Sequence, residues 1–201
     1  MDRANLYLSW GFIPIPIRPR SKAPAMSRWQ MTGRRDALQN IYSAMRRFGL
    51  IDPPTYTPPL NLGIVCGEAS GVIVLDIDKR GGGVERWESA ISIFGKPDTL
   101  TVRTGSGGLH VYFRLPRDGV ASKLPTCRDC FYPGWDLRSN GGQVLGPYSI
   151  HPETGREYMP EYGYSIDGSY HVIPHFSLPP VWLLDPYTAF LQLPPTAQGE
   201  A

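Results

Sequence analysis

The sequence is poor in cysteine, in long apolar runs and in net charge. The 201 residues hold three cysteines, Cys66, Cys127 and Cys130, which are too few and too unevenly spaced for a disulfide framework. No stretch approaches the roughly 20 apolar residues that cross a bilayer, and the first residues, MDRANLYLSWGF, lack the apolar core of a secretory signal. We therefore expect a cytoplasmic protein without a membrane partner.

The net charge of +2 does not by itself indicate a nucleic-acid partner. It leaves room for a local basic groove, because net charge says nothing of how the charges are distributed. Five basic residues suit such a groove: Arg20, Lys22, Arg35, Arg46 and Arg47. We expect them to form a basic face for single-stranded DNA.

The rest of the composition is that of a globular protein. Apolar residues make up 41% of the chain and charged residues 19%, an ordinary balance for a soluble protein with a core. The 22 glycines and 21 prolines are scattered between apolar runs, which predicts many short strands and tight turns rather than disorder. The length suits one domain or two tightly joined subdomains, and no internal repeat is visible.

The alternation of apolar runs and turns predicts a mixed α/β or α+β fold. Helical spacing of apolar residues predicts helices over residues 34–50 and 84–94, and a last helix is expected within 179–193. Apolar runs at 61–66 and 71–78 predict a hairpin-like pair of buried strands. A run at 12–18 is interrupted by proline and predicts an edge strand. Further strands are expected at 99–103, 109–115 and 143–146.

Asp76 and Asp78 end the apolar run VIVLDID. In a strand their side chains share one face, with backbones about 6.6 Å apart at a rise of ~3.3 Å per residue. Two such carboxylates can hold a pair of divalent ions ~3.5–4 Å apart, and Mg²⁺ prefers oxygen ligands of this kind together with substrate phosphates. The alternative is a strand end whose acids face solvent.

A glycine-rich segment, TGSGGLH, spans residues 104–110. Its glycines would let backbone amides approach a phosphate, and Ser106 adds a hydroxyl donor. His110 follows at the start of a strand, where its ring could reach the same anion. No Gly-Lys-Ser/Thr follows, so the segment is not a P-loop. The alternative is a glycine-rich hairpin turn beside an ordinary histidine.

The segment WDLRSNGG, residues 135–142, adds a carboxylate and a guanidinium two residues apart. In a strand Asp136 and Arg138 share a face, so Asp136 could complete a three-carboxylate metal site and Arg138 could neutralise phosphate charge. The alternative is a surface ion pair beside a glycine turn. Together, the acid pair, the glycine segment with His110 and the third acid favour metal-assisted phosphoryl transfer.

These motifs, in this order, resemble the bifunctional primase-polymerase domain of the archaeo-eukaryotic primase superfamily, which occurs in replication proteins of plasmids and phages. The resemblance covers roughly residues 10–158. The matching stretches are PRSKAP at 19–24, NLGI at 61–64, VLDID at 74–78, SGGLHVYF at 106–113, DLR with GG at 136–142, and GPYSIHP at 146–152 with Thr154, Gly155 and Tyr158.

The resemblance implies a small α/β subdomain joined to an RRM-like sheet subdomain, with a cleft between them. It implies one catalytic domain over residues 1–201, with a core at about 10–160 and a C-terminal extension at 161–201 that leads to a helicase or priming module. The expected activity is that of a DNA primase and DNA-directed polymerase, working with two Mg²⁺ or Mn²⁺ ions. Its expected partners are a single-stranded DNA template, a primer and dNTPs or NTPs, during phage or plasmid replication in a bacterial or archaeal cytoplasm.

The resemblance also assigns roles to individual residues. Asp76, Asp78 and Asp136 would bind the metal ions. The triphosphate of the incoming nucleotide would contact His110, Ser106 and the amides of Gly107 and Gly108. Arg138, Asn140 and Gly142 would lie along the nucleotide. Lys22 would contact a phosphate or the template, although its short motif is equally compatible with a structural turn.

The chain departs from the family pattern at two positions. Gly108 stands where many members have serine, and Tyr148 stands where relatives often repeat proline. Some relatives carry a zinc-binding insertion near the third acid, and here Cys127 and Cys130 have the spacing of half a zinc site. Zinc bound by these two cysteines is one interpretation, and two reduced thiols in a loop is the other.

Two other functions share parts of the pattern. A nucleotide-sugar glycosyltransferase also uses Asp-x-Asp with a divalent metal, but that function does not explain the glycine segment with His110, or Asp136 with Arg138. A replication-initiator module would bind DNA through the same scaffold without catalysis. The three acids argue against such a module, because a pure DNA binder gains nothing from carboxylates that face phosphates.

Overall fold

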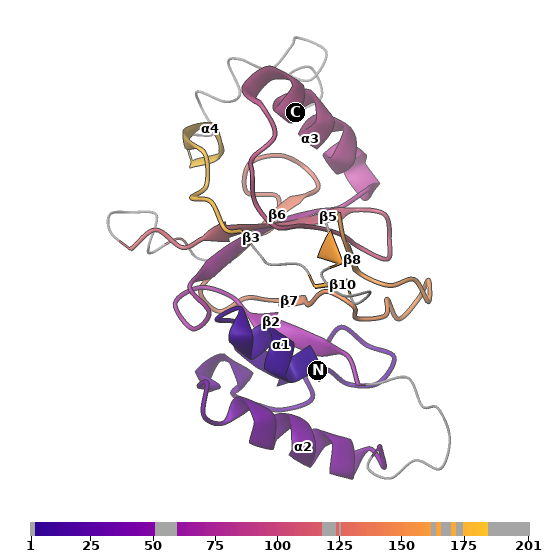
Figure 1. Ribbon diagram of the computed structural model, residues 1–201. Coiled ribbons are helices and arrows are strands. Elements are labelled where there is room, and N and C mark those ends of the chain that lie inside the picture. The colour runs from indigo at the N-terminus through magenta and orange to yellow at the C-terminus, as the bar shows by residue number, and fades with distance from the viewer. Residues whose placement is uncertain are drawn as a thin grey trace.

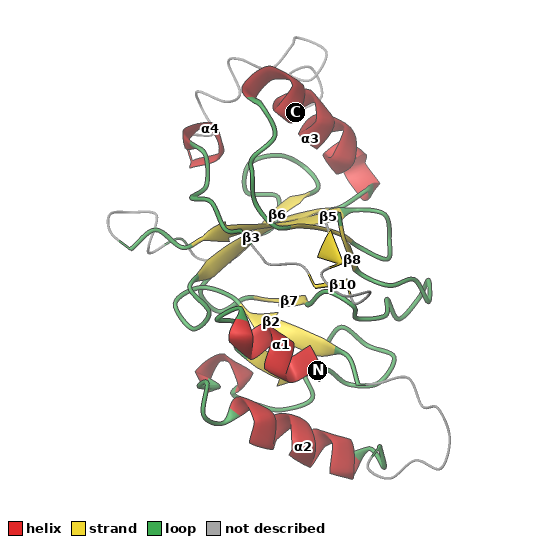
Figure 2. Ribbon diagram, in the orientation of Figure 1, coloured by secondary structure: helices red, strands yellow, loops and turns green. Residues whose placement is uncertain are grey.

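Two antiparallel sheets form the centre of the molecule (Figure 1, Figure 2). The computed structural model describes residues 3–50, 60–117, 124, 126–161, 164–165, 170–171 and 175–184. Every strand pair in it is antiparallel, so the fold is of the mixed α+β kind. The mixture of helix and sheet predicted from the sequence is thereby confirmed.

The larger sheet has five strands in the order β6-β3-β5-β4-β8 and the smaller one has three in the order β1-β2-β7. The larger comprises β6 (Trp135–Arg138), β3 (Val72–Ile77), β5 (Leu109–Arg114), β4 (Thr101–Arg103) and β8 (Met159–Pro160). The smaller comprises β1 (Pro14–Pro16), β2 (Leu62–Val65) and β7 (Gln143–Leu145). A separate pair joins β9 (Tyr164–Ser165) to β10 (Tyr170–His171). The helices are α1 (Arg3–Ser9), α2 (Ala37–Arg47), α3 (Gly83–Phe94) and α4 (Val181–Leu184), with 3₁₀ turns at Trp29–Met31 and Arg80–Gly82.

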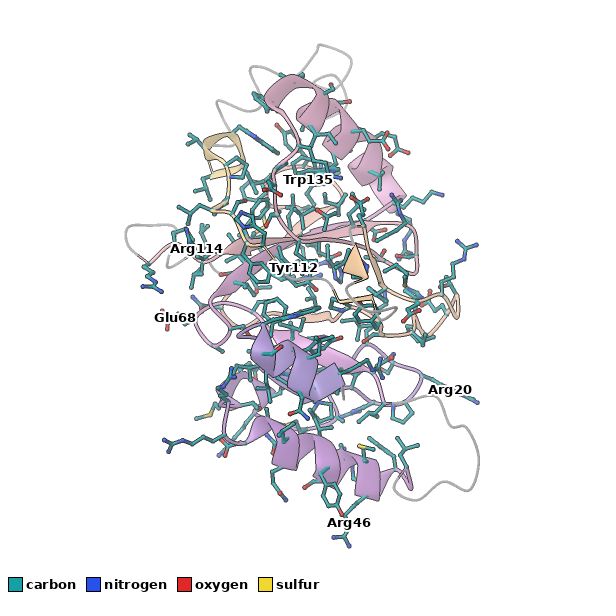
Figure 3. All side chains as sticks on the ribbon, viewed as in Figure 1. Arg20, Arg46, Glu68, Tyr112, Arg114 and Trp135 are labelled. Carbon is teal, nitrogen blue, oxygen red and sulfur yellow. A yellow bond between two sulfur atoms is a disulfide. The ribbon has the colours of Figure 1, made fainter. Side chains whose placement is uncertain are left out.

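The layers run from α3, through the five-stranded sheet and the three-stranded sheet, to α1 and α2 (Figure 1). Side chains along β3 point alternately to the two faces of the sheet, so each face of the strand packs in a different core. Ile73 and Ile77 face the α3 side, where Trp87 and Trp135 pack. Val74 faces the three-stranded sheet in a second core. Figure 3 shows Trp135 and Tyr112 on the two sides of the five-stranded sheet.

The predicted hairpin of residues 61–66 and 71–78 is wrong. β2 and β3 belong to different sheets, and a single bridge from Gly67 to Val72 joins the two segments. The physical reason is that both edges of each strand are already taken. β3 lies between β5 and β6, and β2 lies between β1 and β7, so neither strand has a free edge for the other.

The helix predicted at 34–50 forms as α2, and only part of its predicted apolar stripe is buried. Ile41 is buried together with Ala37 and Ala44, whereas Leu38 is 42% exposed and Tyr42 is 51% exposed. The two alanines carry small side chains on the face that packs on β1. Leu38 and Tyr42 therefore stay at the surface.

The remaining elements agree with the sequence pattern in most cases. The edge strand β1, the helix α3 and the strands β4, β5 and β7 lie where they were expected, while α1 was not predicted. The last helix is present as Val181–Leu184, and residues 185–193 of that prediction lie outside the described residues. Among the helices that the structure describes, none has the length and apolar character to cross a membrane.

Candidate active site

The pairing of three strands brings the predicted chemical groups into one row. In the centre of the sheet, Asp76 of β3 lies opposite His110 of β5 on one side and opposite Asp136 of β6 on the other. Side chains that are paired in this way lie about 5 Å apart at Cβ. Motifs that are distant in the sequence therefore form a single cluster, as the predicted shared function requires.

A pocket of about 520 Å³ opens over this row, and residues from both sheets line it. Seven of the predicted site residues contribute to it: Lys22, Asp76, Asp78, Ser106, His110, Asp136 and Arg138. Several other residues that line it were given no role in the site from the sequence, among them Arg80, Arg128, Asp129 and Tyr158, the last of which lies in a stretch that matches the family. A signal was present for two of them, since Arg128 and Asp129 lie between the two cysteines.

Both carboxylate oxygens of Asp76 have a nitrogen-bearing side chain beside them. His110 Nε2 lies 3.4 Å from Oδ1, and Arg138 Nη2 lies 3.2 Å from Oδ2. Burial raises the pKa of this carboxyl, but the charges and hydrogen bonds of His110 and Arg138 outweigh burial and lower its pKa to about 2. Asp76 is therefore ionised at neutral pH.

Arg138 also reaches Asp136 and joins the two acids. Its Nη2 lies 2.6 Å from Asp136 Oδ2, while the other oxygen, Oδ1, accepts a hydrogen bond from the backbone N–H of Asp129 at 2.9 Å. Arg128 Nε lies farther off, at 3.8 Å from Oδ2. The acids and the guanidinium thus form a compact ion-pair network at the floor of the pocket.

The third predicted acid, Asp78, follows the end of β3 and binds its own loop. Its Oδ1 accepts a hydrogen bond from the backbone N–H of Arg80 at 3.0 Å, and its side chain is 46% exposed. The regular strand ends at Ile77, although the backbone N–H of Asp78 still donates a hydrogen bond to the carbonyl of Gly134 at 2.8 Å. Asp78 nevertheless lines the same pocket.

The donor set fits a divalent cation in its chemistry. Asp76 and Asp136 are hard oxygen donors on directly opposed positions, and a cationic group already lies between them. Among the residues that the structure describes, no three His, Cys, Asp or Glu side chains are arranged to hold a metal ion. The guanidinium of Arg138 lies against both acids.

The glycine segment forms a closed turn rather than an open cradle. Gly107 donates its N–H to the carbonyl of Thr104, and Gly108 donates its N–H to Thr104 Oγ1, both at 2.9 Å. Both amides are therefore used within the turn here, and phosphate binding by Gly107 and Gly108 stays a prediction. Ser106 lines the pocket, with its Oγ 3.0 Å from Thr104 Oγ1.

Gly108 is required for close packing. A Cβ at this position would lie 2.1 Å from the carbonyl oxygen of Ile77, a backbone atom that cannot move independently. The serine found here in many relatives does not fit without a shift of β5 against β3. The glycine thus allows the two strands that carry His110 and Asp76 to approach each other.

Replacing Gly108 with alanine should lower the free energy of unfolding by about 1–3 kcal/mol, the usual cost of overpacking. Gly33→Ala is the matched control, because its added Cβ would meet only Asp36 Oδ2, at an ordinary 3.5 Å. Urea unfolding followed by circular dichroism measures both variants. Equal midpoints for the two variants would contradict the packing role of Gly108.

Asn140 and Gly142 lie outside the residues that line the pocket. Asn140 Oδ1 accepts a hydrogen bond from the backbone N–H of Glu68 at 3.0 Å, and a Cβ on Gly142 would lie 2.2 Å from Thr126 Oγ1. The structure thus uses both residues to hold neighbouring turns in place. Their contact with a nucleotide stays a prediction.

The basic residues expected to form one face are separated. Lys22 lines the pocket, whereas α2 lies on the outer side of the three-stranded sheet, and Figure 3 shows Arg46 pointing away from the molecule there. On the same helix, Arg47 donates a hydrogen bond to the carbonyl of Ala25. The structure therefore does not place Lys22 and the arginines of α2 on one basic face.

The structure joins Cys127 and Cys130 in a disulfide, so neither the zinc site nor the pair of free thiols is observed. A disulfide leaves no thiolate to bind zinc. The loop is held to β6 by a bridge between Cys127 and Leu137, which brings its tip to the pocket. Cys66 is a buried free thiol in the core between the sheets, and burial raises its pKa to about 12.

Comparison with known families identifies one match. The family model described as bifunctional DNA primase/polymerase, N-terminal, matches residues 4–168. That range includes every residue that lines the pocket, from Lys22 to Tyr158. No curated protein sequence matches the chain.

Proposed function

The chain belongs to the bifunctional DNA primase/polymerase family, a family of nucleotidyltransferases, and from this we propose that its pocket adds nucleotides to a primer on a single-stranded DNA template. The reaction joins the primer's 3′ hydroxyl to the α-phosphate of a dNTP or NTP and releases pyrophosphate. The observation that carries the proposal is the row of His110, Asp76 and Asp136 on three adjacent strands at the floor of one pocket.

Asp76, Asp78 and Asp136 would hold two Mg²⁺ or Mn²⁺ ions. When bound, such ions activate the attacking hydroxyl and neutralise charge on the triphosphate. The position of the acids supports this assignment, because Asp76 and Asp136 are opposed and Asp78 lines the same pocket.

The nitrogen-bearing and hydroxyl side chains of the pocket would bind and orient the triphosphate. His110 and Arg138 lie beside the acids, and Lys22 and Ser106 line the same pocket. Donors that are held in place before the substrate binds stabilise the charge that develops at the phosphates.

The biological setting that we propose is phage or plasmid DNA replication. In this proposal residues 10–160 form the catalytic core, and 161–201 connect it to a helicase or priming module. Both points rest on the motifs shared with replication proteins.

Incubation of the protein with a primed single-stranded template, labelled dNTPs and Mn²⁺ or Mg²⁺ should lengthen the primer in a template-directed order. The same assay without a primer, with labelled NTPs or dNTPs, should yield short new strands. Gel separation of the products measures both activities. Template binding without incorporation would indicate a DNA-binding module, and transfer of sugar from a nucleotide sugar would indicate a glycosyltransferase; either result would contradict the proposal.

A further inference from the structure

Arg138 occupies the position between two acids where a bound cation would lie. Its Nη2 is 2.6 Å from Asp136 Oδ2 and 3.2 Å from Asp76 Oδ2, so one nitrogen serves both carboxylates. The side chain is largely buried, with 25% of its surface exposed, and it lines the pocket. A single positive charge therefore neutralises the central part of the acidic cluster.

The other donors to these acids act on one carboxylate each. His110 approaches Asp76 Oδ1, and the N–H of Asp129 binds Asp136 Oδ1. Among the described residues, Arg138 is the donor with hydrogen bonds to both acids. Movement of this one side chain would free the facing oxygen of each carboxylate at the same time.

Arg138 reaches the two acids from the neighbouring position of its strand and lines the pocket. In the strand register Arg138 lies opposite Val74, one row away from the acids, so its long side chain reaches back to them. Arginine also binds phosphate oxygens with the same planar group that binds carboxylates. From its place in the pocket wall, the guanidinium could pair with either kind of oxygen.

We propose that Arg138 is an internal cation that competes with divalent metal for Asp76 and Asp136 and transfers to the triphosphate when metal binds. This inference rests on the function proposed above and adds a regulatory element to the same site. In the metal-free protein Arg138 keeps the two carboxylates from repelling each other. Metal binding must displace it, so the affinity for metal is low until a triphosphate offers the guanidinium new partners.

The two binding events are then linked. A triphosphate that takes Arg138 raises the affinity for metal, and metal that releases Arg138 raises the affinity for the triphosphate by the same factor. The nucleotide-free protein would remain largely metal-free, and the complete site would assemble when the nucleotide arrives.

Binding of Mn²⁺ to nucleotide-free protein, measured by electron paramagnetic resonance of the free ion, tests the proposal without turnover. Arg138→Gln should bind Mn²⁺ about tenfold more tightly than the wild type, because the competing charge is gone. Arg128→Gln is the matched control. It removes the same charge from a side chain that is 85% exposed and 3.8 Å from Asp136 Oδ2, and it should tighten binding less than about threefold, because exposed charges interact weakly.

A thermal melt checks the same variants in a second way. Arg138→Gln should lose stability in EDTA and regain it with Mn²⁺, more so than the wild type, because the unpaired acids then depend on the metal. Equal Mn²⁺ affinities for the two glutamine variants, or weaker binding by Arg138→Gln than by the wild type, would overturn the inference while leaving the metal site in place. Failure of the wild type and both variants to bind Mn²⁺ would overturn the metal site and this inference with it.

Discussion

Replacement of Asp76 with alanine should abolish nucleotide incorporation at every nucleotide concentration while template binding persists. Asp76 is the central member of the row, with His110 on one side and Asp136 on the other. Loss of a metal-binding carboxylate removes several kcal/mol of charge stabilisation in the transition state, and each ~1.4 kcal/mol is tenfold in rate. We therefore expect the rate to fall by at least about a thousandfold.

The matched control for this variant is Asp98→Ala, which removes an exposed carboxylate outside the pocket. It should extend primers at the wild-type rate. Circular dichroism and binding of a labelled oligonucleotide establish that both variants are folded and hold template. Primer extension by the Asp76→Ala protein at a near-normal rate with Mg²⁺ or Mn²⁺, free of contaminating polymerase, would rule out the catalytic assignment.

Replacement of His110 with alanine should weaken nucleotide binding about 10- to 100-fold and change the rate at saturation less. The imidazole lies at the start of β5, just after the glycine turn, and only 5% of its surface is exposed. A hydrogen bond to a charged group contributes about 1.5–3 kcal/mol, which corresponds to this range of affinity. Excess nucleotide should therefore restore much of the activity.

Steady-state kinetics at rising dNTP concentration separates the two effects, since KM should increase while kcat stays within a few-fold of the wild type. His175→Ala serves as the control, because this histidine is exposed and lies outside the pocket. A lower kcat with an unchanged KM would show that His110 acts in the chemical step rather than in binding.

The sequence predicted the parts of the site that depend on local pattern. The alternation in VIVLDID indicated a buried strand, and this strand places Asp76 at the pocket. It did not indicate that the regular strand ends at Ile77, one residue before Asp78, although Asp78 lines the same pocket. The extent of a strand depends on its neighbours, and the neighbours of β3 come from distant parts of the chain.

The glycine turn shows why other details could not be predicted. Glycine at a given position is compatible with a free amide, a positive φ or close packing, and only the fold decides among them. Here Gly107 has φ 93° and Gly108 packs against the backbone of Ile77. Tyr148 is a similar case, with a φ of 65°. Proline cannot adopt this value, because its ring holds φ near −65°. The proline that relatives often have here is therefore incompatible with this turn.

The antiparallel register of the five-stranded sheet also has a consequence for how the enzyme is made. β3 ends at Ile77, but its partner β6 begins only at Trp135, so the pair closes a long loop. Contacts between residues so far apart in sequence form slowly, because the entropy of loop closure is lost before the contact is gained. During synthesis on the ribosome, Asp76 emerges well before Asp136 and Arg138. A nascent chain therefore holds an incomplete, inactive site until β6 docks, and a fragment that stops before β6 should never acquire one.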